Sequence, residues 1–264
     1  CRSKNKVEQP MIKDFDLLQR ANNDYTTIDL EHAEELAYRE LIDSIRYISL
    51  GDECGVMGNI ANIITYKGRF YIQEEQFDRV FIYDDTGRCL KKIDNKGRGP
   101  GEYLRIESID INTEKEELML VDGMSDKLFF YDLDGNFKSI HSIRYFQTEN
   151  TLCLRDSVFL HISAPSQNFG NDGLYGYALV LSKGNENFLK GYRYLPLQVG
   201  YKGGGQIFKG YERSCYHPIY SDTIYQILSD TTYGPIFYFK IKNSSWEKYH
   251  NSDRFVDIDG SEEG

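Results

Sequence analysis

The chain has 264 residues, of which 31 are Lys or Arg and 41 are Asp or Glu, so its formal net charge is −10. This length can hold one large all-β domain or two ordinary domains, and a content of 40% hydrophobic residues excludes a disordered chain. The acidic balance argues against nucleic acid as a partner, because binding to phosphates needs a basic surface.

The N-terminal end predicts a lipid attachment site. The chain begins with Cys1, which is followed by the polar run Arg2–Lys6. A mature chain that starts at cysteine is typical of a processed bacterial lipoprotein, in which the thiol carries the lipid and polar residues form a tether. We therefore expect lipidation at Cys1, membrane contact through that lipid and a tether over residues 1–25. The alternative is a chain trimmed at an arbitrary point.

Before the central part of the sequence, one helix and one strand are expected. Leu30–Leu41 places apolar residues on one helical face, although the segment also fits an irregular lead-in. Ile45–Leu50 is predicted to be a strand. In a closed propeller, an N-terminal strand of this kind would complete the last blade.

The most informative feature of the sequence is an internal repeat of 48 residues. The segment Phe70–Gly87 recurs without a gap as Leu118–Gly135. The identical pairs are Asp78/Asp126, Phe81/Phe129, Tyr83/Tyr131, Asp84/Asp132 and Gly87/Gly135. The same register continues upstream through Ile63/Ile111, Thr65/Thr113 and Lys67/Lys115.

Each repeat unit predicts four antiparallel strands. Two runs of aromatic and β-branched residues are separated by a polar turn, and the second run ends in an Asp-x-x-Gly turn. One strand precedes these runs and another follows them. Four strands in about 48 residues are typical of one β-propeller blade, so we expect an all-β propeller fold.

Two looser units follow the clear pair. Ser157–His161 and Tyr177–Leu181 are predicted as the middle strands of a third unit, with a polar insertion at Ser163–Leu174 between them. Asp222–Ile227 lies three periods after Asp78 and marks a fourth unit. We therefore assign the propeller to residues 26–242. Residues 243–264 form either an acidic polar tail or the start of a missing blade.

Four cysteines lie beyond the N-terminus: Cys54, Cys89, Cys153 and Cys215. None forms a Cys-x-x-Cys pair, which excludes a zinc ribbon and a thioredoxin-type motif. Four thiols allow three pairings, and the sequence does not choose among them. Cys89 lies among strand-forming residues and is interpreted as a small buried hydrophobic residue.

Several stretches carry a family resemblance. They are Ile45–Leu50 with Cys54, the loop Gly97–Tyr103, the turns after Tyr83 and Tyr131, and Ser221–Tyr225. With these stretches the sequence resembles the six-bladed β-propeller lipoproteins of Gram-negative gut bacteria, relatives of NHL-repeat propellers. The resemblance implies a six-bladed ring and a lipid-anchored location in the bacterial cell envelope, periplasmic or at the cell surface. It implies no activity, and the four visible units predict a ring that is incomplete relative to this family.

The Gly-rich loop at Gly97–Gly101 lacks the spacing of a phosphate-binding loop and is not followed by a helix pattern. We interpret it as a crossover between blades. Arg98, Glu102 and Tyr103 are ligand-binding candidates there, because they could face the mouth of the ring.

A second set of ligand-binding candidates lies in the irregular third unit: Tyr175, Tyr177, Tyr192 and Tyr194. Loops on rigid scaffolds often carry function, and aromatic faces stack on sugars. The alternative is that these side chains pack within blades. The five histidines are scattered and the Asp-rich turns lack calcium-ligand spacing, so no metal, cofactor or catalytic residue is predicted.

Together these observations predict an envelope-anchored propeller that binds a protein or a glycan and is not an enzyme. One alternative is a propeller lyase or hydrolase that acts on glycans, for which carboxylates or a His-Tyr pair would have to converge in a central pocket. The other alternative is a structural subunit of an envelope complex.

Overall fold

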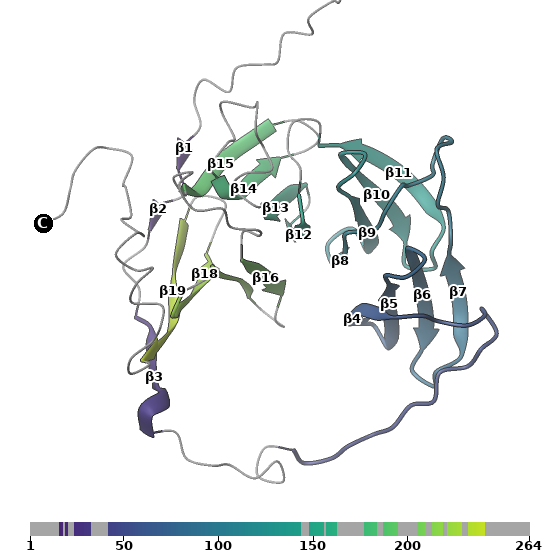
Figure 1. Ribbon diagram of the computed structural model, residues 1–264, viewed down its shortest axis with the longest axis horizontal. Helices are drawn as coiled ribbons and strands as arrows, with labels where there is room; N and C mark the ends of the chain where they lie inside the picture. The colour runs from purple at the N-terminus through teal and green to yellow at the C-terminus, as the bar shows by residue number, and fades with distance from the viewer. Residues whose placement is uncertain are drawn as a thin grey trace, which may run out of the picture.

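The computed structural model describes residues 16–17, 19–20, 24–32, 42–143, 148–155, 157–162, 177–183, 187–194, 205–209, 213–218, 221–228 and 232–240. Figure 1 shows that strands dominate these residues. Helical structure within them is limited to a single 3-10 turn, Leu30–His32. The all-β prediction is therefore confirmed. The rest of the helix considered at Leu30–Leu41 falls outside the described residues.

Four antiparallel meanders make up the core of the fold, and we call them blades 1 to 4 in chain order. Blade 1 contains β4 (Ile60–Tyr66), β5 (Arg69–Glu74), β6 (Arg79–Asp84) and β7 (Cys89–Ile93). Blade 2 contains β8 (Ser108–Asn112), β9 (Glu117–Asp122), β10 (Lys127–Asp132) and β11 (Phe137–Ser142).

The later blades follow the same order. Blade 3 contains β12 (Asn150–Arg155), β13 (Val158–Ile162), β14 (Tyr177–Lys183) and β15 (Asn187–Tyr194). Blade 4 contains β16 (Gln206–Lys209), β17 (Ser214–His217), β18 (Thr223–Ile227) and β19 (Thr232–Lys240). The middle strands predicted for the third unit and the strand predicted after Asp222 are confirmed.

The blades follow one another around a common centre (Figure 1). The first strand of each blade is innermost: β8 contacts both β4 and β12, and β12 also contacts β16. Separate clusters of buried side chains fill the spaces between blades 1 and 2, blades 2 and 3, and blades 3 and 4. Sheets that stack face to face in this way give a propeller-like architecture.

The clear repeat is reproduced closely in the structure. β5 and β9 begin and end 48 residues apart, as do β6 and β10. Asp78 and Asp126 both adopt a left-handed backbone conformation, with φ of 57° and 54°. In the following turns, the Asp84 carboxylate accepts the backbone N–H groups of Thr86 and Arg88, and Asp132 makes the equivalent two bonds. Identical residues therefore serve identical turns.

The upstream part of the predicted register is wrong. Ile63 pairs with Ile72 on β5, and the residue 48 positions after Ile72, Leu120, pairs with Ile109 instead of Ile111. The cause is the length of the hairpin, since Lys67–Gly68 joins β4 to β5 whereas Thr113–Glu116 joins β8 to β9. Two extra loop residues shift the inner strands relative to the rest of the repeat.

The predicted strand at Ile45–Leu50 is also wrong, because this segment has no strand structure. A different N-terminal segment joins the last blade: β3 (Thr26–Asp29) pairs in parallel with β19. Two shorter strands within the stretch expected to be a tether also pair in parallel with outer strands. These are β1 (Asp16–Leu17), beside β15, and β2 (Gln19–Arg20), beside β19.

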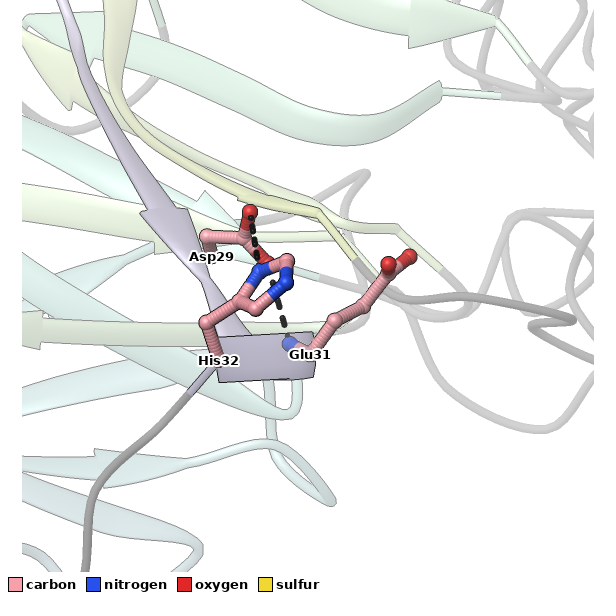
Figure 2. Close-up of side chains that lie close together, drawn as sticks. All are labelled: Asp29, Glu31 and His32. Carbon is pink, nitrogen blue, oxygen red and sulfur yellow. Dashed lines mark hydrogen bonds and ion pairs between the residues drawn. The ribbon is translucent and has the colours of Figure 1, made fainter.

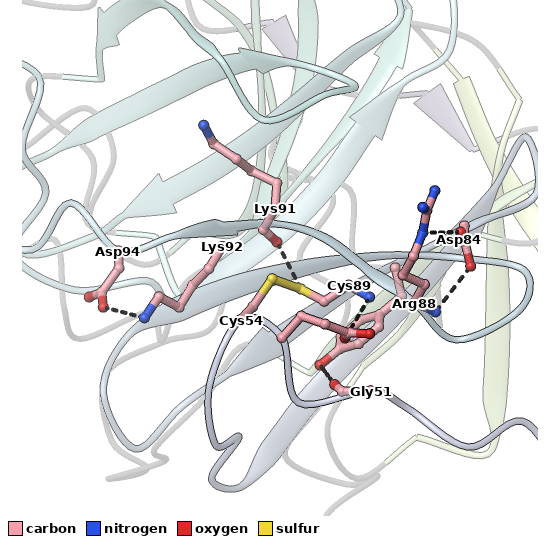
Figure 3. Close-up of a disulfide and its surroundings, with 10 residues drawn as sticks. Gly51, Cys54, Asp84, Arg88, Cys89, Lys91, Lys92 and Asp94 are labelled. Carbon is pink, nitrogen blue, oxygen red and sulfur yellow. Dashed lines mark hydrogen bonds and ion pairs between the residues drawn. A yellow bond between two sulfur atoms is a disulfide. The ribbon is translucent and has the colours of Figure 1, made fainter.

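A disulfide links Cys54 to Cys89, the first residue of β7 (Figure 3). The interpretation of Cys89 as an isolated buried residue is therefore wrong. Cys153 and Cys215 take no part in this disulfide, and both are buried.

Candidate functional site

The inner strands bring three chemistry-bearing residues together near the centre of the fold: Asp110 from β8, Cys153 from β12 and Lys209 from β16. The Lys209 ammonium lies 3.2 Å from the Asp110 carboxylate and donates to the carbonyls of Ile111 (2.9 Å) and Cys153 (2.8 Å). The Cys153 backbone N–H donates to the same carboxylate at 2.7 Å. The cluster thus connects three blades.

The contacts of this cluster stabilise the fold and do not favour chemical reactivity. Asp110 is 3% exposed, and burial raises the pKa of its carboxyl group while Lys209 and the Cys153 N–H oppose that rise. An ammonium group has three N–H donors, and three acceptors surround that of Lys209. Burial raises the pKa of the Cys153 thiol to about 12, which disfavours the thiolate.

A second polar group crosses the sheet of blade 3. His161 is fully buried, with Nδ1 2.9 Å from Thr151 Oγ1 and Nε2 2.7 Å from Ser182 Oγ. Burial lowers the pKa of His161 to about 3, so the imidazole is neutral. A buried neutral histidine between two hydroxyl groups joins β12, β13 and β14 and offers no proton to a substrate in solvent.

Asp29, Glu31 and His32 offer ligand atoms close enough to share a metal ion (Figure 2). Each ligand already has a local role or lies in solvent. Asp29 accepts the Glu31 N–H and lies 3.1 Å from His32 Nδ1, and Lys240 Nζ lies 3.0 Å from the Asp29 carboxylate. Hydrogen bonds from Lys240 and then His32 lower the pKa of Asp29 to about 2. The Lys240 ammonium already pairs with the Asp29 carboxylate, which favours an ion pair that holds β3 on β19.

The crossover from blade 1 to blade 2 contains the first set of predicted residues. Tyr103 differs from the expectation of a position at the mouth of the ring, because it is 0% exposed and its hydroxyl donates to the carbonyl of Asp78 at 2.8 Å. Glu102 accepts the Gly99 N–H at 2.7 Å and so closes the Gly-rich loop on itself. Arg98 is exposed. Of the three candidates, Arg98 and Glu102 remain available to a ligand.

The second set is only partly within the described residues. Tyr177 on β14 pairs with Tyr194 on β15, and Leu179 pairs with Tyr192, so the backbone brings three of the candidates together. Tyr175 lies outside the described residues, as do Cys1, the insertion Ser163–Leu174 and the tail 243–264.

Comparison with known proteins places the chain in a family. Residues 25–262 match the model of a family described as "Domain of unknown function (DUF4934)". The chain belongs to the DUF4934 family. No curated protein matches this DUF4934 sequence.

Among solved structures, the DUF4934 chain is similar to a Bacteroides fragilis protein described as exported, with 20% identity and a TM-score of 0.70. The similarity covers 86% of the DUF4934 chain and 65% of that protein, so the chain spans about two thirds of its length. It supports the fold alone.

Weaker similarities reach a DUF4221 family member from Bacteroides vulgatus and BamB from Moraxella catarrhalis. Their TM-scores are 0.44 and 0.41, with 10% and 11% identity. They cover 67% and 66% of the DUF4934 chain, and 56% and 46% of the respective proteins. Neither carries an argument about function.

Sequence reasoning missed the central Asp110–Lys209 pair and the disulfide. Asp110 stands in a strand of alternating polar and apolar residues, and nothing in the sequence connects it with Lys209, which lies 99 residues away. The one available signal was the charged residue itself, because a buried strand in a propeller centre rarely keeps an aspartate without a partner.

Proposed function

We propose that this DUF4934 protein is an exported binding protein, held at the bacterial envelope by a lipid on Cys1, that recognises a protein or a glycan without transforming it. The observation that carries this proposal is the state of the Lys209 ammonium. All three donors of this group bond to acceptors on the inner strands β8 and β12. The cluster of Asp110, Cys153 and Lys209 therefore stabilises the fold.

Export is supported by the disulfide between Cys54 and Cys89. Disulfides persist in oxidising compartments such as the periplasm and are rare in the bacterial cytosol. The structural relative from Bacteroides fragilis is described as exported. Within the described residues, no helix has the length and apolar character needed to cross a membrane.

Ligand recognition is assigned to the crossover loop at the edge of blades 1 and 2. Arg98 and Glu102 are exposed there, and the loop is held at its base by the buried Tyr103. A fixed loop that presents a guanidinium group suits carboxylate or hydroxyl groups of a partner, because the guanidinium offers several donors in one plane.

The test is a binding screen against peptide and glycan arrays, with product analysis on every ligand that binds. We expect binding without products, and a loss of affinity of about tenfold in Arg98→Ser, the size expected when one charge-assisted hydrogen bond is removed. Lys91→Ser is the matched control, since Lys91 is an exposed cation on the neighbouring strand β7. Turnover of any ligand, or equal losses in both variants, would contradict the proposal.

Lipid anchoring is tested separately by mass spectrometry of the N-terminal peptide from native membranes. An acylated Cys1 supports the anchor. An unmodified Cys1 would overturn the anchor and leave the binding function standing.

A further inference from the structure

The segment of residues 46–57, which we call the strap, runs along blade 1 without forming a strand. It is bonded to the turn that follows β6: the Gly51 backbone N–H donates to the carbonyl of Gly87 at 2.8 Å, and the Arg46 guanidinium donates to the carbonyl of Asp85 at 2.6 Å. The Tyr83 hydroxyl donates to the Gly51 carbonyl at 3.2 Å. Figure 3 shows this region, with the disulfide from Cys54 to Cys89 beside it.

The strap covers an apolar face of blade 1. Ile72, Phe81 and Tyr83 are almost fully buried in a cluster that is completed by Cys54 and Met57 of the strap, together with Phe70 and Cys89. None of these residues belongs to the cluster between blades 1 and 2. The strap therefore seals the face of blade 1 that points away from blade 2.

The repeat shows what normally covers this face. The residues 48 positions after Ile72, Phe81 and Tyr83 are Leu120, Phe129 and Tyr131, and in blade 2 these side chains pack against blade 1. In blade 2 this apolar face is covered by blade 1. In blade 1 the equivalent face is covered by the strap. The strap packs closely on the turn at Gly87, where a Cβ atom would clash with the Ser49 carbonyl oxygen. Among the described residues, the strap thus takes the place of a neighbouring blade on this face.

We propose that the strap is a reducible end cap, and that cleavage of the Cys54–Cys89 disulfide releases it and uncovers the apolar face of blade 1. The reductant is a dithiol. One of its thiolates attacks a disulfide sulfur, its second thiol resolves the mixed disulfide, and the products are two protein thiols and one oxidised dithiol. Two electrons and two protons are transferred to the protein. Both cysteines are only partly buried, so the disulfide is accessible.

Reduction removes the covalent link between the strap and β7. What then holds the strap is its apolar packing and a few hydrogen bonds, each worth about 1 kcal/mol. Segments held in this way open by local fluctuation without unfolding the rest of the protein. The disulfide prevents such opening because Cys54 cannot leave the edge of β7.

The experiment is hydrogen exchange measured by mass spectrometry on the folded, oxidised protein before and after treatment with dithiothreitol. We expect the Gly51 and Gly55 amides to exchange at least about tenfold faster after reduction, while exchange in β9 and β10 stays unchanged. Binding of an apolar dye should rise in parallel, since Ile72 and Phe81 become exposed. Because the protein is folded before reduction, a failure to fold does not enter the result.

The two buried thiols supply the controls. Cys153 and Cys215 should resist alkylation under native conditions while Cys54 and Cys89 react after reduction. Cys54→Ser should reproduce the exchange of the reduced protein, and Cys215→Ser should keep the strap protected. Unchanged exchange at Gly51 after reduction would overturn the proposal. So would a simultaneous rise in β9, because the cap would then not be a separable element.

Discussion

Blades 1 and 2 share one sequence repeat but differ in the environment of their first strands. All five residues of β8 are buried, whereas most of β4 is exposed and Ile63 keeps 51% of its surface accessible. β8 lies between β4 and β12, and β4 has one such neighbour among the described strands. The comparison teaches that the repeat determines the strands and turns of a blade, while the neighbours determine its burial.

The difference is clearest at one pair of positions. Ile64 of β4 pairs with Tyr71, and Asp110 of β8 pairs with the residue 48 positions later, Met119. The position is aliphatic in blade 1 and acidic in blade 2. Only the acidic one is joined to Lys209 of blade 4.

The largest expected effect comes from removing this acid. Asp110→Ala removes the carboxylate partner of the Lys209 ammonium and the acceptor of the Cys153 N–H, and we expect a loss of about 3–5 kcal/mol in the free energy of unfolding. The double variant Asp110→Leu with Lys209→Met should recover most of the loss, because apolar residues of similar volume can replace a buried pair. Urea unfolding measures both. Equal losses in the single and double variants would show that the ion pair does not limit stability.

The next effect concerns the joint between the two blades. Tyr103→Phe removes a buried hydroxyl that donates to the carbonyl of Asp78 and accepts the Asn95 N–H at 3.1 Å. We expect the free energy of unfolding to fall by about 1–2 kcal/mol, as for other buried groups that lose their partner. Tyr47→Phe, at a side chain that is 91% exposed, is the control and should change nothing. If Tyr103→Phe left the free energy of unfolding unchanged, packing alone would hold the crossover.

A smaller effect separates the two hairpins. Gly68 has a φ of 70° in blade 1, and Glu116 has a φ of 53° at the end of the longer loop in blade 2. Gly68→Ala should cost about 1 kcal/mol, because a Cβ disfavours this left-handed conformation. Glu116→Ala should be nearly neutral, since a side chain is already present there. Thermal unfolding measures the stability loss in each variant. Equal losses would show that the hairpin loop of blade 1 can change its backbone conformation to accept the Cβ.

The smallest effect depends on pH. Burial raises the pKa of Glu107, which lies just before β8 with its side chain 22% exposed. The charged form is therefore disfavoured in the folded state, and this penalty is absent below the unfolded-state pKa and complete above the folded-state pKa. Glu107→Gln should raise the melting temperature slightly at pH 7 and leave it unchanged near pH 4. A lower melting temperature at pH 7 would show that the ion pair with Arg105 outweighs burial.

The sequence was most informative where structure is local. The Asp-x-x-Gly turns and the strands around them depend on residues close in the chain, so the repeat predicted the positions of β5, β6, β9 and β10 to within one or two residues at most ends. The inner strands were misaligned because a hairpin that is longer by two residues breaks the period. Ile45–Leu50 alternates like a strand, yet it forms no ladder, and this stretch is bonded to the turn at Gly87 through the neighbouring Gly51 N–H and the Arg46 side chain.

The candidate site depended on contacts that the sequence does not encode locally. Tyr103 was predicted to face a ligand because it follows a Gly-rich loop, but burying an aromatic ring in the joint between blades is more favourable than exposing it. The pairing of Cys54 with Cys89 depends on the path of the strap, which spacing cannot reveal. Arg98 is exposed, and its role in ligand binding stays a prediction.

The parallel pairing of β3 with β19 has a consequence for the order of folding. The ion pair between Asp29 and Lys240 joins residues that are 211 positions apart. Contacts of such separation form slowly, since a long loop must close before they contribute. During synthesis, β3 emerges long before β19, its partner strand. A strand near the start of the chain is therefore among the last to pair.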